Sequence, residues 1–270
     1  MVPARRPQHP RPPTQTGLAH VDVLAANEAP ALADYITAVS EYVRESPRLS
    51  LSAKKTAQIA LSKALGRCLK EELEERVPHL DAFAGELNVA GALRTTRADV
   101  SESHPLDGLR LAVEIKPINL AVGRAIWNRF GDIRAFAVNI HLKFPFAVVG
   151  GILALPTWEW RGSARSPLEV QQEPGEADAG DREEGEPEEA PDEMGRVHTG
   201  PVIDRLVRRL ARTPLRRSEA DAPHLLEGVA VVVYDPSTAT LDPGLPLPGS
   251  GLRWDEFVAT LAETYDLRFE

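Results

Sequence analysis

Two runs of apolar residues constrain the fold of this chain more than any other feature of its sequence. The first is "FAVVGGILAL" at 146–155, and the second is "GVAVVVYD" at 228–235. Both contain several β-branched residues, which favour strands. A strand that is apolar on both sides must be covered on both faces of its sheet. The two runs therefore predict central strands with helices on either side.

Helices are expected around these strands because apolar residues recur three or four positions apart. Asn119 is a candidate to cap the helix that starts near 122. Further strands are expected near 86–92, 93–101 and 109–117. This order predicts an α/β fold with a mixed central β-sheet flanked by helices. The expected helices cover about 29–46, 51–77, 122–140, 201–212 and 254–264.

Charge is distributed unevenly over the 270 residues. The net charge is −9, yet 166–193 alone holds twelve acidic residues and one arginine, so the remainder carries +2. Segment 166–195 also has few large apolar residues, which predicts an acidic disordered insertion. We expect it to shield the basic helix near 201–212 as an internal phosphate mimic. Residues 1–17 are Pro-rich and predict a disordered tail.

The domain organisation follows from these two segments. Residues 18–165 are expected to form a core with N-terminal helices, and 196–270 are expected to complete the same α/β domain. The N-terminal residues lack the apolar centre of a signal peptide, and the longest apolar run, 144–156, is too short to cross a bilayer. With a single cysteine, Cys68, these features predict a cytoplasmic protein without a membrane partner.

Glu114 and Lys116 stand out at the end of the apolar segment "LRLAVEIKP". Residues two apart on a strand share a face, so the two charges project side by side. The residues 104–108, "HPLDG", suit a hairpin turn. Opposed positions then have numbers that add to about 213, which places Asp99 across from Glu114. Directly opposed residues have Cβ atoms roughly 5 Å apart.

Two carboxylates at that distance repel each other and need compensating positive charge. Lys116 supplies one charge, and a divalent cation would supply the rest. Mg²⁺ binds through one or two protein carboxylates and leaves other positions to water and phosphate. A bound cation acidifies water and stabilises charge on a phosphoryl group, while Lys116 could orient the attacking water or neutralise phosphoryl oxygens.

This pattern resembles that of the PD-(D/E)xK nucleases, a superfamily of restriction and repair enzymes. The matching residues are Ala98-Asp99, with alanine in place of proline, and Glu114-Ile115-Lys116. The resemblance covers about 52–160 and implies a restriction endonuclease-like fold. It further implies a DNA endonuclease that uses Mg²⁺, with Mn²⁺ as a substitute, and in which Asp99, Glu114 and Lys116 are catalytic.

The resemblance also raises alternatives for individual residues. Asp107 could stand in for Asp99, but it falls in the turn. The family often adds a metal ligand from the first core helix, and Glu72 is the candidate because it continues the stripe of Leu61, Leu65 and Cys68. Glu71 and Glu75 compete with Glu72 for this role. Asp99, Glu114 and Glu72 are thus the expected metal ligands.

Basic residues on two expected helices are candidates for binding the DNA backbone. A homodimer, a methyltransferase or another defence-system partner would fit a restriction enzyme. The alternative is a catalytically inactive nuclease fold that binds DNA or protein within a defence or repair complex. His141 and Lys143 suit the C-terminal dipole of their helix. The candidate DNA contacts are Arg124, Asn128, Arg205, Arg208, Arg209 and Arg212, with Arg216 and Arg217 beyond.

Overall fold

The computed structural model describes residues 16–26, 30–161 and 191–270. The tail expected at 1–17 and the acidic insertion expected at 166–195 lie largely outside these ranges. The helices are α1 (Ala19–Ala26), α2 (Leu32–Glu45), α3 (Leu51–Arg76), α4 (Val122–His141), α5 (Gly200–Leu210) and α6 (Trp254–Phe269), with a 3-10 turn at Ser46–Arg48.

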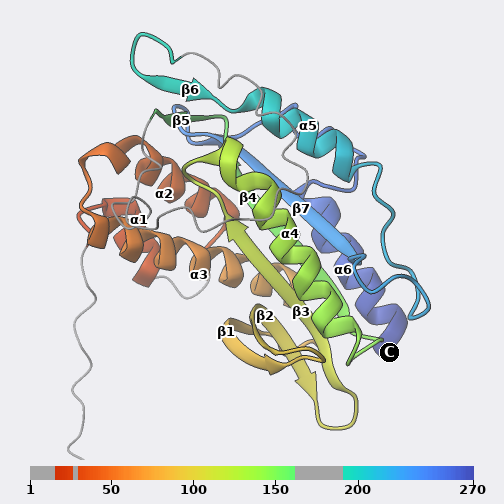
Figure 1. Ribbon diagram of the computed structural model, residues 1–270. Helices are drawn as coiled ribbons and strands as arrows, with labels where there is room; N and C mark the ends of the chain where they lie inside the picture. The colour runs from red at the N-terminus through yellow and green to blue at the C-terminus, as the bar shows by residue number, and fades with distance from the viewer. Residues whose placement is uncertain (1–15, 27–29, 162–190) are drawn as a thin grey trace, which may run out of the picture.

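A six-stranded mixed sheet forms the centre of the molecule (Figure 1). Strands β1, β2 and β3 are antiparallel neighbours, β3, β4 and β7 are parallel, and β8 returns antiparallel to β7. The prediction of an α/β fold around a mixed sheet is confirmed. The strands in spatial order are β1 (Phe83–Ala90), β2 (Thr95–His104), β3 (Gly108–Pro117), β4 (Val148–Pro156), β7 (Gly228–Asp235) and β8 (Thr240–Leu241).

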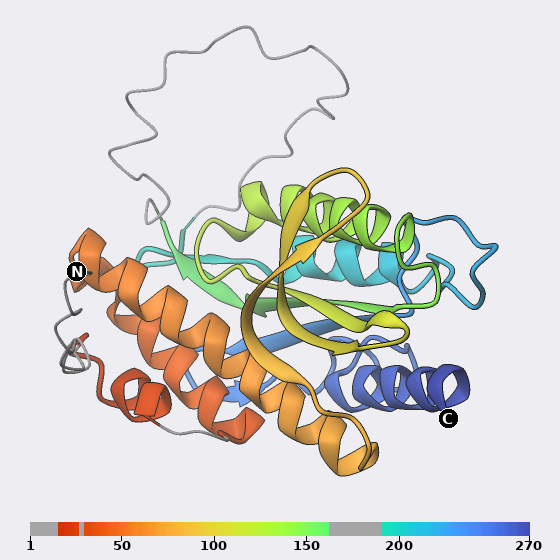
Figure 2. The same ribbon diagram turned by 90° about the horizontal axis from the view of Figure 1, so that it is seen from below.

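Helices cover both faces of the sheet (Figure 2). One face packs against α1, α2, α3 and α6, and the other packs against α4 and α5. On β4, Val148 and Ile152 contact the first layer, whereas Val149 and Leu153 contact the second. This alternation explains why the run at 146–155 is apolar throughout.

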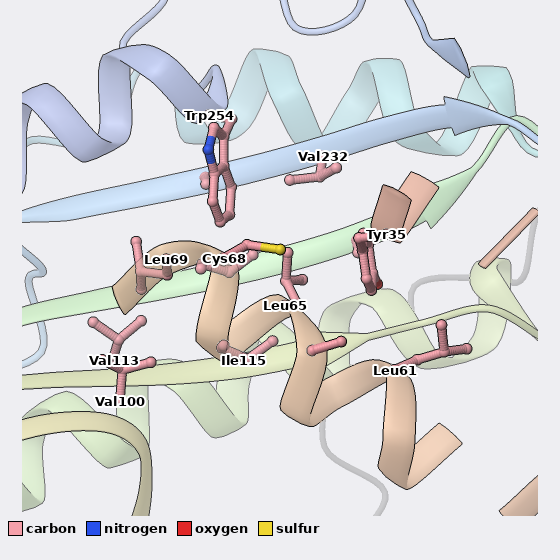
Figure 3. Close-up of a cluster of buried hydrophobic side chains, with 14 of the residues drawn as sticks. Tyr35, Leu61, Leu65, Cys68, Leu69, Val100, Val113, Ile115, Val232 and Trp254 are labelled. Atoms are coloured by element: carbon pink, nitrogen blue, oxygen red, sulfur yellow. The ribbon is translucent and has the colours of Figure 1, made fainter. Parts of the chain in front are cut away.

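Two packing contacts explain details of the sequence. Figure 3 shows Leu61, Leu65, Cys68 and Leu69 of α3 against the sheet, as the apolar stripe predicts. On the opposite face, a Cβ atom at Gly151 would lie 2.4 Å from Cγ2 of Ile133. Gly151 therefore allows α4 to approach β4 closely, whereas Gly150 faces Leu261 and Phe257 of α6.

The prediction that Asn119 caps α4 is wrong. Asn119 is buried, and its side-chain oxygen accepts a hydrogen bond from the Tyr234 hydroxyl at 3.0 Å. The main-chain N–H of Val122 instead donates to both carboxylate oxygens of Glu159, at 3.1 Å each. A negative charge at a helix N-terminus is favourable, so a distant strand caps this helix.

Several element boundaries differ from the sequence-based expectations. The first two strands begin three and two residues away from the expected positions, and α6 extends five residues beyond Thr264. Helix α1 was not expected, nor was the small sheet of β5 (Trp158–Trp160) and β6 (Arg196–His198). Within the described ranges, no helix is both long and apolar enough to cross a membrane.

Candidate active site

The hairpin of β2 and β3 has the predicted register near Asp99. Val100 pairs with Val113, and these numbers add to the expected 213. Asp99 and Glu114 are the next opposed positions, and there the main-chain ladder ends. Oδ2 of Asp99 accepts a hydrogen bond from the N–H of Ile115 at 2.7 Å. The carboxylate thus takes the place of a main-chain carbonyl where the two strands separate.

Glu114 and Lys116 lie side by side on β3 and form an ion pair. Val113 and Ile115 pack in the α3 layer, whereas Ala112 packs in the α4 layer. By strand alternation, Glu114 and Lys116 face the α4 side. Their side chains are 12% and 25% exposed, so both charges are partly desolvated.

The pKa values of both carboxyl groups depend on burial and on neighbouring charges. Burial raises the pKa of Glu114 to about 7, although the Lys116 charge lowers it, and the charges of Asp99 and Asp132 raise it further. Burial also raises the pKa of Asp99, against the Ile115 hydrogen bond and the charge of Lys116. Both carboxyl groups therefore hold their protons more tightly than free carboxyls do.

A cleft of about 240 Å³ opens beside Asp99, between α3 and β1. Asp99 and Pro117 line it, while Glu114 and Lys116 are not among the described residues that do so. Asp99 therefore lies next to both the cleft, on the α3 side, and the Glu114–Lys116 pair. The remaining lining residues are Lys55, Gln58, Ile59, Ser62 and Lys63 of α3, and Gly85 and Glu86 of β1.

The polar face of α3 was missed by the sequence analysis, which followed only the apolar stripe of this helix. This polar flank consists of Lys55, Gln58, Ser62 and Lys63. It lies next to Leu61 and Leu65 on the helix. A helix that packs beside a strand end exposes such a flank to the site. The polar flank is the sequence feature from which these residues could have been predicted. Asp132 on α4, whose charge raises the pKa of Glu114, was not predicted either.

Glu72 does not join the site. Its Oε1 accepts a hydrogen bond from Nε1 of Trp254 at 2.7 Å, which directs the side chain toward α6. Burial raises the pKa of Glu72, and the charges that act on it come from Arg76, Glu75 and Asp255. The structure therefore does not bring Glu72 to Asp99 and Glu114, and its role as a metal ligand stays a prediction without support from this contact.

The candidate DNA contacts lie on the α4 and α5 layer. Arg124 and Asn128 are exposed on α4, and the guanidinium of Arg209 stacks over Trp127 at 5.0 Å. Arg208 pairs with Asp204 at 2.7 Å, which reduces its availability. Arg205 is exposed on α5, and Arg212 is exposed beyond the end of the helix.

Arg216 does not extend this basic surface. It is only 2% exposed, and Nη1 donates to the carboxylate of Glu227 at 3.2 Å. His141, expected to act only on the helix dipole, is buried beside the same carboxylate, with Nε2 3.2 Å from Oε2. Both residues therefore belong to a buried ionic cluster away from the surface.

The donor set at Asp99 and Glu114 fits a divalent cation. Among the described residues, Oδ1 of Asp99 and Oε2 of Glu114 make no hydrogen bond, so one oxygen of each carboxylate is available. Mg²⁺ needs no more than one or two protein carboxylates. A cation would also offset the charge that burial disfavours at both groups.

One other group of side chains in the described ranges could hold a cation. His79, Asp266 and Glu270 offer ligand atoms that all lie within 4.8 Å of one another. His79 and Glu270 are exposed, and His79 lies between the ends of α3 and β1. Metal-binding experiments on Asp99 and Glu114 must take this second cluster into account.

Comparisons of the chain with known protein families, curated proteins and solved structures found no match.

Proposed function

We propose that this protein hydrolyses phosphodiester bonds of DNA in a metal-dependent reaction. The observation that carries the proposal is that two partly buried carboxylates, Asp99 and Glu114, occupy opposed positions on β2 and β3, with Lys116 paired to Glu114. The charge of Asp99 raises the pKa of Glu114, and one oxygen of each carboxylate makes no hydrogen bond among the described residues. Burial disfavours both charges, and a cation bound between them would restore the balance.

The three residues have distinct roles in this proposal. Asp99 and Glu114 would hold Mg²⁺ or Mn²⁺, which when bound supplies an acidified water and stabilises charge on the phosphoryl group. The Lys116 ammonium can donate to a phosphoryl oxygen or orient the attacking water. Its ion pair with Glu114 fixes the ammonium next to the carboxylates.

The order of elements around the site supports the resemblance to the PD-(D/E)xK nucleases. The acid lies on β2, Glu114 and Lys116 lie on β3, and α4 then leads to the parallel strand β4. The proposal also includes a role in restriction or phage defence, a homodimer and a methyltransferase partner. These three points rest on the resemblance alone.

Nicking of supercoiled plasmid DNA with Mg²⁺ or Mn²⁺ tests the proposal. Lys116→Ala should lower the nicking rate at least about 100-fold, because it removes one charged donor from the transition state. Lys70→Ala is the matched control, since Lys70 also pairs with a glutamate, Glu74, but lies on α3 away from the site. The control should nick like the parent protein.

Two outcomes would overturn the proposal. The first is a Lys116→Ala variant that nicks as fast as the parent, provided both proteins show the same thermal unfolding. The second is a parent protein that binds DNA but nicks neither DNA nor RNA with either metal. The second outcome would favour the inactive DNA-binding subunit.

A further inference from the structure

The cleft between α3 and β1 carries its positive charge on one wall. Lys55 and Lys63 of α3 are exposed, and neither forms an ion pair within the described part of the chain. On the β1 wall, Glu86 is already paired with Arg97 at 2.8 Å. The helix wall therefore presents two ammonium groups without partners to a ligand in the cleft.

Between the lysines, the cleft is open and has both polar and apolar lining, with Ile59 exposed on the helix wall. Gln58 and Ser62 supply neutral hydrogen-bonding groups on the helix wall. Facing them, the pairing of β1 with β2 shifts register between Ala84 and Leu87, and Gly85 has no side chain to fill the space. A chain of alternating charged and neutral units can lie along such a wall.

The spacing of the two lysines suits a nucleic-acid backbone. Eight residues of α-helix correspond to about 12 Å along the axis. One strand of B-form DNA carries a phosphate roughly every 3.4 Å along its axis, so about three or four phosphates occupy this distance. The two lysines would then contact different phosphates of the same strand.

The size of the cleft limits the ligand to part of one strand. Its volume of about 240 Å³ is smaller than the roughly 300 Å³ of the smallest pockets that enclose a drug-sized molecule. A sugar–phosphate backbone fits this volume, whereas a duplex does not. Asp99, one of the carboxylates of the candidate active site, also lines the cleft.

From these observations we infer that the α3 wall of the cleft holds the backbone of the strand that is cut. Lys55 and Lys63 bind its phosphates and direct it toward Asp99. The inference rests on the proposed function for the identity of the ligand. It assigns this task to α3, on the opposite side of the sheet from the arginines of α5 (Figure 2).

The salt dependence of DNA binding tests the inference. Fluorescence anisotropy of a labelled single-stranded DNA oligonucleotide, recorded with EDTA, measures affinity without cleavage. Loss of two phosphate contacts should reduce the slope of log affinity against log salt by about 1.4. Between about 50 and about 200 mM salt, the Lys55→Ala/Lys63→Ala variant should then lose about sevenfold less affinity than the parent.

The matched control removes the same charge from the same helix. Lys54→Ala/Lys70→Ala alters two lysines of α3 that do not line the cleft, and it should retain the slope of the parent. Lys55→Arg/Lys63→Arg should retain it as well, because the charge is kept. Equal slopes for the cleft variant and the control variant would overturn the inference.

This test fails separately from the proposed function. If the parent does not nick nucleic acid but the cleft variant has the reduced slope, the cleft binds a strand and the nuclease proposal falls. If the parent nicks DNA but the slope is unchanged, the nuclease proposal stands and the cleft inference falls. In active protein, the cleft variant should raise KM more than it lowers kcat, since its lysines contact phosphates that do not react.

Discussion

At the scale of single residues, the charge of Glu114 lowers the free energy of unfolding at neutral and alkaline pH. Its pKa is raised by burial from 4.5 to about 7, even though the Lys116 charge opposes this change. A difference of this size corresponds to roughly 3 kcal/mol. The folded protein holds this proton more tightly than the unfolded chain, so stability falls as pH rises from about 4.5 to about 7. Above about pH 7, this contribution of roughly 3 kcal/mol to the free energy of unfolding is fully lost.

Glu114→Gln should therefore stabilise the protein at alkaline pH. At about pH 8 the variant should exceed the parent by up to roughly 3 kcal/mol in free energy of unfolding, because it removes a buried charge. At about pH 4 the two proteins should be equally stable, since the parent carboxyl is then protonated whether folded or unfolded. Urea unfolding at both pH values measures the difference.

A control is available in another partly exposed ion pair. Glu74→Gln alters a glutamate that pairs with Lys70 and is 26% exposed. It should show no gain in stability at alkaline pH. If Glu114→Gln raised the free energy of unfolding equally at the two pH values, the charge of Glu114 would not be the source of the gain in stability.

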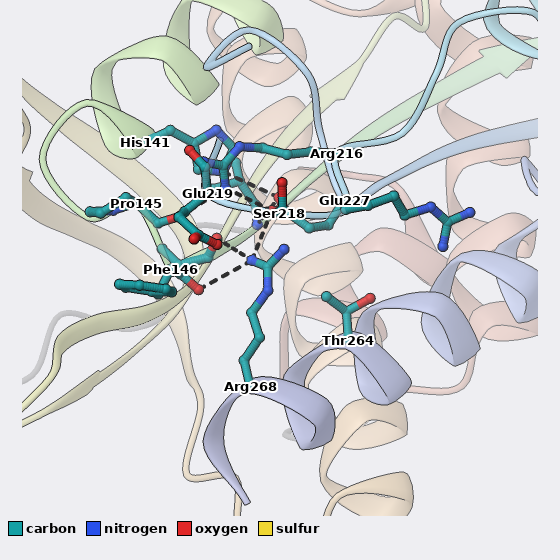
Figure 4. A network of polar contacts seen from close by, with 12 residues as sticks. His141, Pro145, Phe146, Arg216, Ser218, Glu219, Glu227, Thr264 and Arg268 are labelled. Atoms are coloured by element: carbon teal, nitrogen blue, oxygen red, sulfur yellow. Dashed lines mark hydrogen bonds and ion pairs between the residues drawn. The ribbon is translucent and has the colours of Figure 1, made fainter. Parts of the chain in front are cut away.

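At the scale of elements, a buried ionic cluster joins strands and helices at the end of the sheet away from the site (Figure 4). Glu227 immediately precedes β7, and its carboxylate accepts from Arg216 at 3.2 Å, Arg268 at 2.8 Å and the N–H of Val149 at 2.9 Å. Its Oε2 also lies 3.2 Å from Nε2 of His141. One carboxylate thus connects α4, β4, β7 and α6.

The state of Glu227 depends on these partners. Burial alone would raise its pKa, but the hydrogen bond from His141, the charges of His141 and Arg268, and the N–H of Val149 together lower it. A lowered carboxyl pKa contributes stability above the normal pKa. That stability is lost as pH falls through the lowered value.

Glu227→Gln should strongly destabilise the protein at neutral pH. It leaves the buried Arg216 and the partly buried Arg268 without this counter-charge, and loss of one partner costs about 3–5 kcal/mol in buried pairs. The deficit should shrink as pH falls through the lowered pKa of Glu227, where the parent carboxylate takes up a proton. Urea unfolding at a series of pH values from about 7 downward measures both effects, with the exposed Glu219→Gln as a control. A deficit that does not depend on pH would contradict the role of the Glu227 charge.

At the scale of the whole molecule, the sheet and its central strands were predictable from the sequence. Continuous apolar runs specify strands covered on both faces. The turn at 104–108 alone does not set the register at Asp99, because Ser103–Leu109 and His104–Gly108 add to 212. A register shift between Glu102 and Ser103 brings the later pairs to 213, and the sequence did not predict this shift.

Features that depend on how helices are placed against the sheet were not predictable. α3 packs against β2 at Gly66, where a Cβ atom would lie 3.5 Å from Val100. Glu72 lies six residues further, about 9 Å along the helix axis, and so reaches α6 instead of Asp99. The partners of Glu227 are 86 and 41 positions away at His141 and Arg268, and no sequence pattern in this chain relates them.

Calorimetric titration with Mn²⁺ tests most directly whether Asp99 and Glu114 together hold a cation. The background should be His79→Ala, which disables the second cluster of candidate ligands. We predict that this protein binds Mn²⁺ and that Asp99→Asn and Glu114→Gln each abolish the binding. Unchanged Mn²⁺ affinity in both variants, or no binding by the background protein, would contradict the account.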